Sequence, residues 1–206
     1  MPGIDDESRG DDDGASGARV DELEGGKPLI WVYSGNPQYL PVRSPVDSAV
    51  VVQACIEALA CEPVKVVLTT GHHALPRRTL PLPDNFRYEP FVPGVEMARR
   101  SDLLIHHGGY GSCQMGLSTG TPAVIMPTYS ERESNARRVA ALGAGEFLLP
   151  LEGRRGRKSV SAQELRGLVR RVLAEPAYEA LARRVGESLA AFGGAPEAAR
   201  LIVDLT

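Results

Sequence analysis

Short apolar runs alternate with helix-like segments from residue 28 to about residue 149, and this alternation limits the possible folds more than any other feature of the chain. Successive runs are separated by about a dozen residues or more, which lets neighbouring strands lie parallel with helices packed against the sheet. Because the runs are apolar at consecutive positions, both faces of the sheet should be covered. The predicted fold class is α/β: a doubly wound, Rossmann-like parallel sheet of about six strands, with helices on both faces and a helical carboxyl-terminal end.

Apolar periodicity and helix-end signals place the individual elements. Strands are predicted at residues 29–33, 64–68, 86–92, 103–105, 122–126 and 147–149, and helices at residues 46–59, 111–119, 135–142, 178–192, 197–205 and from residue 161 onward. Ser44 followed by Pro45 is typical of a helix start, and Ser161 with Glu164 forms a capping box. A polar loop is predicted at residues 128–135.

The first 27 residues hold nine acidic and three basic side chains and very few large apolar ones. Such a segment buries too little apolar surface to offset the entropy cost of ordering it. We therefore predict a disordered acidic tail or interdomain linker at residues 1–27 and one domain at residues 28–206. The overall net charge of −3 does not favour a nucleic-acid partner.

The sequence carries no signal for a membrane, secreted or metal-binding protein. No apolar run approaches the roughly 18–20 residues that a membrane span needs, and the first thirty residues hold no apolar signal segment. Cys55, Cys61 and Cys113 lack metal-ligand spacing, and the pair at residues 72–73 (two histidines) has no third ligand nearby. We expect a cytoplasmic protein with free thiols, no bound metal and no direct membrane insertion.

The strongest candidate for a ligand site is the glycine-rich segment that follows the predicted strand at residues 103–105. It begins with His106 and His107 and leads into the helix at residues 111–119. Glycines let the backbone approach a ligand, and a helix start presents unpaired N–H groups with partial positive charge, so a diphosphate is the natural occupant. The alternative is a corner with no ligand role, because the segment is neither a dinucleotide fingerprint nor a Walker loop. The turn at residues 34–36 is a second, weaker candidate.

A longer stretch that includes this segment resembles a known motif. Residues 107–145, HGGYGSCQMGLSTGTPAVIMPTYSERESNARRVAALGAG, resemble the donor-binding motif of two-domain (GT-B type) nucleotide-sugar glycosyltransferases. The most similar group holds the UDP-glycosyltransferases of plants and animals and the bacterial antibiotic (macrolide) glycosyltransferases. LIWVYSGN, VKVVLTTG and NFRYEPFVPGVEM resemble earlier parts of the same carboxyl-terminal domain, so that the likeness covers essentially residues 28–206.

The resemblance implies a donor site assembled from several parts of the chain. Its residues, given in turn for the diphosphate, the nucleobase and the sugar, are His107, Gly109, Gly111, Ser112, Gly35 and Asn36, then Phe91 and Val92, then Glu131 and Arg132. The residues alone also allow two other interpretations. Phe91 could be a core residue at the end of a strand, and Glu131 could be a solvated carboxylate in a loop.

Two positions depart from the family pattern. Arg132 stands where the family usually has a sugar-binding Gln, and because a guanidinium has only donors, an anionic or otherwise modified sugar becomes conceivable. Met115 stands where plant and animal members have a ribose-binding Glu, which indicates a bacterial type. Cys113 is predicted to be a small buried residue of the helix and not a nucleophile.

The resemblance implies an inverting transfer of a sugar from a UDP- or dTDP-sugar to an acceptor hydroxyl of a small molecule. No cofactor is expected, because the nucleotide sugar is a co-substrate, and the leaving diphosphate would be stabilised by the helix start and His107. The general base would come from an amino-terminal acceptor-binding domain. None of the four histidines matches that base, so we expect no catalytic residue and no turnover in this chain alone.

Four interpretations remain open. The chain is the carboxyl-terminal half of a conventional enzyme, which we favour, or a natural subunit of a split glycosyltransferase with a membrane-associated partner. It is otherwise a non-catalytic nucleotide-binding module, which Arg132 favours, or part of a sugar-nucleotide epimerase of related architecture.

Overall fold

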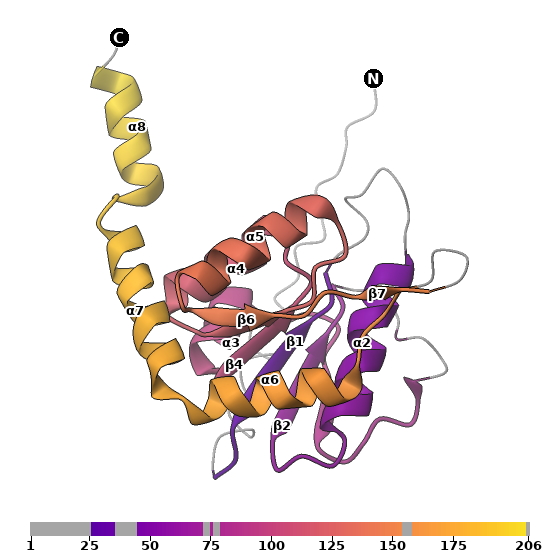
Figure 1. Cartoon of the computed structure of the whole chain (residues 1–206). Helices are drawn as coiled ribbons and strands as arrows, with labels where there is room; N and C mark the ends of the chain where they lie inside the picture. The colour runs from indigo at the N-terminus through magenta and orange to yellow at the C-terminus, as the bar shows by residue number, and fades with distance from the viewer. Residues whose placement is uncertain (1–25, 36–44, 72–74, 76–78, 154–157, 205–206) are drawn as a thin grey trace, which may run out of the picture.

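The computed structural model describes residues 26–35, 45–71, 75, 79–153 and 158–204. Its centre is a parallel sheet of six strands in the order β3-β2-β1-β4-β5-β6 (Figure 1). The strands are β1 Leu29–Tyr33, β2 Lys65–Thr69, β3 Phe86–Tyr88, β4 Leu103–His106, β5 Ala123–Ile125 and β6 Gly145–Phe147. The predicted fold class is confirmed. The predicted tail at residues 1–27, apart from its last two residues, lies outside the described residues, as do Asn36, Ser44 and the two histidines at residues 72–73.

Helices cover both faces of the sheet. The side chains of β1 alternate between these two faces, so that each face has its own hydrophobic core under the helices. Ile30 and Val32 pack in one core with residues of α2 and α6, and Trp31 packs in the other with residues of α3, α4 and α5. The helices are α2 Pro45–Leu59, α3 Gly94–Arg100, α4 Tyr110–Thr119, α5 Ser130–Ala141, α6 Ala162–Ala174, α7 Pro176–Ala190 and α8 Gly194–Asp204.

The strand order puts a topological switch point at the middle of the sheet. β1 is paired with β2 on one side and with β4 on the other, so that Trp31 lies opposite both Val67 and Leu104. The chain moves outward from β1 to β3, returns to the centre as β4 and then moves outward in the opposite direction. In such a sheet ligands bind outside the carboxyl ends of the strands at this point, here the ends of β1 and β4.

Three predicted elements differ from the structure. The strand predicted at residues 86–92 ends at Tyr88 and is followed by the unpredicted helix α3, because Pro90 and Pro93 have no N–H group for the sheet. Helix α5 begins at Ser130, so that the predicted polar loop ends early and the helix is five residues longer at its start. Only Ala136 and Val139 of α5 are buried, which leaves too weak an apolar pattern to mark its first turn.

Smaller differences lie at the carboxyl-terminal side of the sheet. The strand predicted at residues 147–149 begins at Gly145, and an antiparallel pair, β7 Leu151–Glu152 with β8 Lys158–Ser159, was not predicted. The predicted cap of α6 is confirmed, since the Ser161 hydroxyl accepts a hydrogen bond from the backbone N–H of Glu164.

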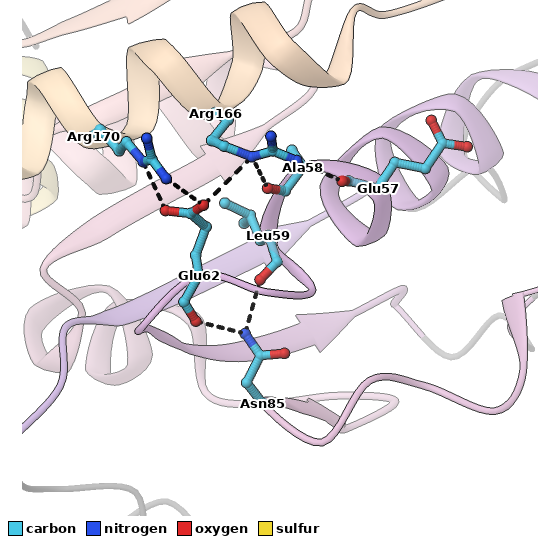
Figure 2. Close-up of polar contacts among 7 residues, drawn as sticks. All are labelled: Glu57, Ala58, Leu59, Glu62, Asn85, Arg166 and Arg170. Atoms are coloured by element: carbon cyan, nitrogen blue, oxygen red, sulfur yellow. Dashed lines mark hydrogen bonds and ion pairs between the residues drawn. The ribbon is translucent and has the colours of Figure 1, made fainter.

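A partly buried carboxylate joins α6 to the turn after α2 (Figure 2). Glu62, whose side chain is 10% exposed, accepts two hydrogen bonds of 2.8 Å from the Arg170 guanidinium. Arg166 lies 3.4 Å from the same carboxylate and donates to the carbonyl oxygen of Ala58 near the end of α2. The Asn85 amide, directly before β3, donates a hydrogen bond to the carbonyl oxygen of Leu59 at the end of α2. This bond connects the start of β3 to the same network. These contacts hold α6 against the end of α2 and the turn that follows it.

Glu62→Gln should lower the free energy of unfolding by about 1 kcal/mol at pH 7. The hydrogen bond and charge of Arg170 hold the pKa of Glu62 below its ordinary value, against the effect of burial. A carboxyl with a depressed folded pKa stabilises the fold above its unfolded pKa, and this contribution disappears as the pH falls through the folded pKa. The difference between wild type and variant should therefore shrink between about pH 5 and pH 3 in urea unfolding curves. Glu57→Gln is the control, because its side chain is exposed and points away from this network (Figure 2); an equal loss there would contradict the assignment.

Helix α8 extends away from the rest of the domain (Figure 1). It follows Gly193 and Gly194, whose φ angles of 71° and 60° lie in the left-handed region, and none of its residues is buried. None of the helices in the described part of the chain is both long and apolar enough to cross a membrane.

Candidate functional site

A cleft of about 540 Å³ opens at the carboxyl ends of β1, β2 and β4, which is within the size range of small-molecule sites. It lies at the switch point that the strand order defines. Its walls come from the strand ends, the segment before α3 and the start of α4, and consist of Trp31, Tyr33, Thr69, Gly71, Pro90, Phe91, Val92, Gly94, His107, Gly109, Gly111, Ser112 and Met115.

Six of the ten predicted donor-binding residues line this one cleft. They are His107, Gly109, Gly111, Ser112, Phe91 and Val92. Gly35 lies behind His107, since a Cβ atom placed on it would stand 2.7 Å from Cε1 of that ring. Glu131 and Arg132 do not line the cleft but lie beside it on α5. Asn36 lies outside the described residues.

The start of α4 forms the polar end of the cleft. Gly109 is the N-cap residue, no described side chain caps the helix, and the first turn holds no acidic residue. The backbone N–H of Cys113 bonds to the carbonyl oxygen of Gly109, which leaves the earlier N–H groups of the helix for a ligand. With the positive end of the helix dipole at the same place, this corner suits an anion.

Two side chains fix the turn that leads into α4. The backbone of Gly108 has a φ of 87°, a left-handed conformation that glycine adopts without strain. Its N–H donates to Nδ1 of His106 at 3.0 Å, and its carbonyl oxygen accepts from the Asn135 amide at 3.1 Å. This role of His106 could not be predicted from the sequence, because its partner is a backbone group that only the folded turn places beside it.

The two adjacent histidines are both neutral near pH 7. Complete burial, and secondly the charge of His107, lower the pKa of His106 to about 3. Burial, and secondly the charge of Arg132, lower the pKa of His107 to about 4, while the backbone of Tyr33 acts in the opposite direction. Among the described residues, Nδ1 of His107 has no hydrogen-bond partner. His107 therefore faces the cleft as a neutral hydrogen-bonding group and not as a cation.

The opposite wall of the cleft is apolar and aromatic. Trp31 is buried and donates from Nε1 to the Thr69 hydroxyl at 2.9 Å, and its ring centroid lies 5.9 Å from that of Tyr33. Met115 packs close to Gly94, where an added Cβ atom would stand 2.8 Å from its sulfur. Trp31, Tyr33 and Thr69 were not predicted as site residues, because residues of apolar strands are normally assigned to the core.

Phe91 is 54% exposed at the mouth of the cleft, which contradicts the alternative that placed it in the core. Val92 beside it is buried. An aromatic ring exposed at the edge of an apolar cleft can contact a planar ligand.

Glu131 and Arg132 lie in the first turn of α5, so the predicted loop position of both residues is wrong. Glu131 is exposed, and its carboxylate accepts a hydrogen bond of 2.7 Å from Asn135. Arg132 lies over the ring of Tyr129, with 4.6 Å between its guanidinium carbon and the ring centroid.

Cys113 is buried, as predicted. Within the described residues, Cys55, Cys61 and Cys113 form no disulfide. Burial raises the pKa of the Cys113 thiol to about 12, with a smaller contribution from Glu131. A thiol with this pKa is not a nucleophile at neutral pH.

Comparison with known proteins gives a consistent set of matches. The family model described as "Erythromycin biosynthesis protein CIII-like, C-terminal domain" matches residues 54–205. Demethyllactenocin mycarosyltransferase of Streptomyces fradiae is 31% identical over 88% of this chain and 36% of its own length. For 4'-demethylrebeccamycin synthase of Lentzea aerocolonigenes the identity is 32%, over 89% of this chain and 40% of its own length.

Among solved structures, the calicheamicin glycosyltransferase CalG4 is similar with a TM-score of 0.71 and 25% identity. The match covers 86% of this chain and 42% of that protein. The chain thus spans less than half the length of the proteins that it matches.

Proposed function

The chain belongs to the family of erythromycin biosynthesis protein CIII-like carboxyl-terminal domains, and from this premise we propose that it is the donor-binding half of a glycosyltransferase. The complete enzyme would move a sugar from a UDP- or dTDP-sugar to a hydroxyl group of a small acceptor. One observation carries the proposal: the cleft at the switch point joins the uncapped start of α4 and neutral His107 to an apolar wall with an exposed aromatic ring. A nucleoside diphosphate matches both ends of this cleft: its diphosphate is anionic and suits the start of α4, and its base is planar and suits the apolar wall.

In the proposed complex the diphosphate lies at the start of α4, against His107, Gly109, Gly111 and Ser112, while Gly35 supports the His107 ring from behind. The predicted contact of Asn36 with the diphosphate is kept. Phe91 and Val92 contact the nucleobase, and Glu131 and Arg132 contact the sugar. Hydrogen bonds and the helix dipole at this corner would stabilise the charge that develops on the leaving diphosphate. The nucleotide sugar is a co-substrate, and the proposed reaction uses no cofactor and inverts the anomeric centre.

The general base and the acceptor site would belong to an amino-terminal acceptor-binding part, either on the same polypeptide or as a separate subunit. The relatives are long enough to contain such a part, since the matched region is 36% to 40% of their length. This chain alone should therefore bind the donor and transfer no sugar.

The test is calorimetric titration of the chain with UDP, dTDP and GDP. We expect binding of UDP or dTDP, and weaker or no binding of GDP, whose purine is larger. The absence of heat with all three nucleotides would overturn the proposal.

Phe91→Ala should weaken binding of the preferred nucleotide about tenfold, because one aromatic ring stacked on a base contributes about 1–3 kcal/mol. Phe192→Ala is a matched control: its ring is 77% exposed at the end of α7 and lies outside the cleft. Calorimetry should show the loss only for Phe91→Ala. Equal affinity of the two variants would remove Phe91 from the nucleobase site.

A further inference from the structure

The side chain of Asn135 connects two parts of the molecule that lie on different elements. Asn135 lies one turn after Glu131 on α5, and its amide donates a hydrogen bond of 2.7 Å to Oε1 of Glu131. The same amide nitrogen donates a second hydrogen bond, of 3.1 Å, to the carbonyl oxygen of Gly108 in the turn before α4. Because an amide NH₂ group has two donors, both bonds form at once. One side chain thus holds both the Glu131 carboxylate and the turn that leads into the diphosphate corner.

The bond to Gly108 sets the direction of a backbone N–H group at the diphosphate corner. The carbonyl group of Gly108 and the N–H group of Gly109 belong to one planar trans peptide unit, in which they point in opposite directions. Gly108 is buried, and a Cβ atom placed on it would stand 2.9 Å from the carbonyl oxygen of Arg132, so the turn packs directly against α5. The bond from Asn135 therefore fixes the orientation of the Gly109 N–H group from the α5 side.

The bond to Glu131 restricts the conformations of an exposed side chain. A glutamate side chain is long and flexible, and it loses conformational entropy when a ligand fixes it. With the hydrogen bond from Asn135 in place, part of this loss occurs before any ligand binds, and such preorganisation raises affinity. A carboxylate has several acceptor positions on its two oxygens, so one bond from Asn135 leaves others for the hydroxyl groups of a sugar.

We propose that Asn135 is a positioning residue that aligns Glu131 with the diphosphate corner and thereby raises the affinity for a nucleotide sugar relative to that for the nucleotide alone. This inference rests on the proposed function and adds a residue that acts through Glu131 and Gly108 and not by contact with the donor. Asn135 is not among the residues that line the cleft. Its effect on the ligand is therefore measurable apart from that of the contact residues.

The test is calorimetric titration of the whole chain with UDP and UDP-glucose, or with dTDP and dTDP-glucose if dTDP is the tighter ligand. Asn135→Ala should weaken UDP about threefold, through the Gly109 N–H group, and UDP-glucose about tenfold or more, because Glu131 is released as well. Asn135→Asp keeps the shape of the side chain but replaces both donors by a carboxylate that repels Glu131, so it should cause at least the same losses. Gln114→Ala removes an exposed amide from α4, outside the cleft, and should leave both affinities unchanged.

A double-mutant cycle shows whether Asn135 acts through Glu131. In a Glu131→Ala chain, Asn135→Ala should weaken UDP and UDP-glucose by the same factor, because the sugar-dependent part of its effect is gone. Both ligands are measured on the same variant, so a partly unfolded fraction lowers the active concentration for both alike and leaves the ratio of their affinities unchanged.

Three results would overturn the inference while the proposed function stands. They are equal losses for the two ligands in Asn135→Ala, unaltered affinities in Asn135→Asp, and a larger loss for UDP-glucose that persists in the absence of Glu131. Failure of the unaltered chain to bind UDP or dTDP would overturn the proposed function itself.

Discussion

Replacing Gly186 by alanine should lower the free energy of unfolding by about 1–2 kcal/mol, whereas the same replacement at Gly167 should raise it by about 0.5–1 kcal/mol. Both glycines lie inside helices, Gly186 in α7 and Gly167 in α6. Alanine favours the helix at each position. The difference lies in what the added methyl group meets.

At Gly186 a Cβ atom would stand 2.7 Å from the backbone carbonyl oxygen of Leu117, so that α7 has to move away from α4. At Gly167 no atom lies within 4 Å of the added Cβ. Urea unfolding followed by circular dichroism measures both changes. A stabilising Gly186→Ala would contradict the close packing of these helices. Because α4 begins at the proposed diphosphate corner, Gly186→Ala should also weaken nucleotide binding.

Gly109→Ala should weaken binding of the nucleoside diphosphate about 10- to 100-fold, with little effect on the fold. The backbone of Gly109, with φ −60° and ψ 144°, accepts any residue. An added Cβ atom would, however, stand 2.5 Å from Nε2 of His107 and displace that ring from the cleft. The expected loss corresponds to one strong hydrogen bond to an ionised ligand, about 1.5–3 kcal/mol.

A double-mutant cycle separates this mechanism from a general disturbance of the loop. If Gly109→Ala acts by moving His107, then adding it to His107→Ala should cause little further loss of affinity. Fully additive losses would contradict the mechanism. Gly167→Ala serves as the control, since it makes the same substitution on α6, outside the cleft.

The sheet was largely predictable because parallel strands covered on both faces consist of continuous apolar runs. The predicted start of β1 and the cap of α6 agree with the structure residue by residue. The errors occur where local signals are weak. The third strand was predicted too long because Phe91 and Val92 are apolar and close to a strand, although prolines exclude them from the sheet.

The diphosphate corner was predictable because it is a continuous stretch at a strand end, and such ends meet at one edge of the sheet. The contact of Lys158 with the carbonyl oxygen of Thr128 was not predictable, since Lys158 lies in a short hairpin that has no strong sequence pattern. His106 illustrates the same limit. Its contact with the backbone of Gly108 depends on the left-handed turn and not on residue types in sequence.

Helix α8 has a consequence for how this chain responds to denaturant. The slope of stability against urea reflects the surface that unfolding exposes, and a helix with no buried residue exposes very little when it melts. A urea unfolding transition should therefore report on the domain up to α7. The ion pairs described for α8 join Arg200 to Glu197 and Asp204 within the helix itself, and a helix of this length without buried residues is marginal in water. We therefore expect α8 to melt separately from the cooperative unit.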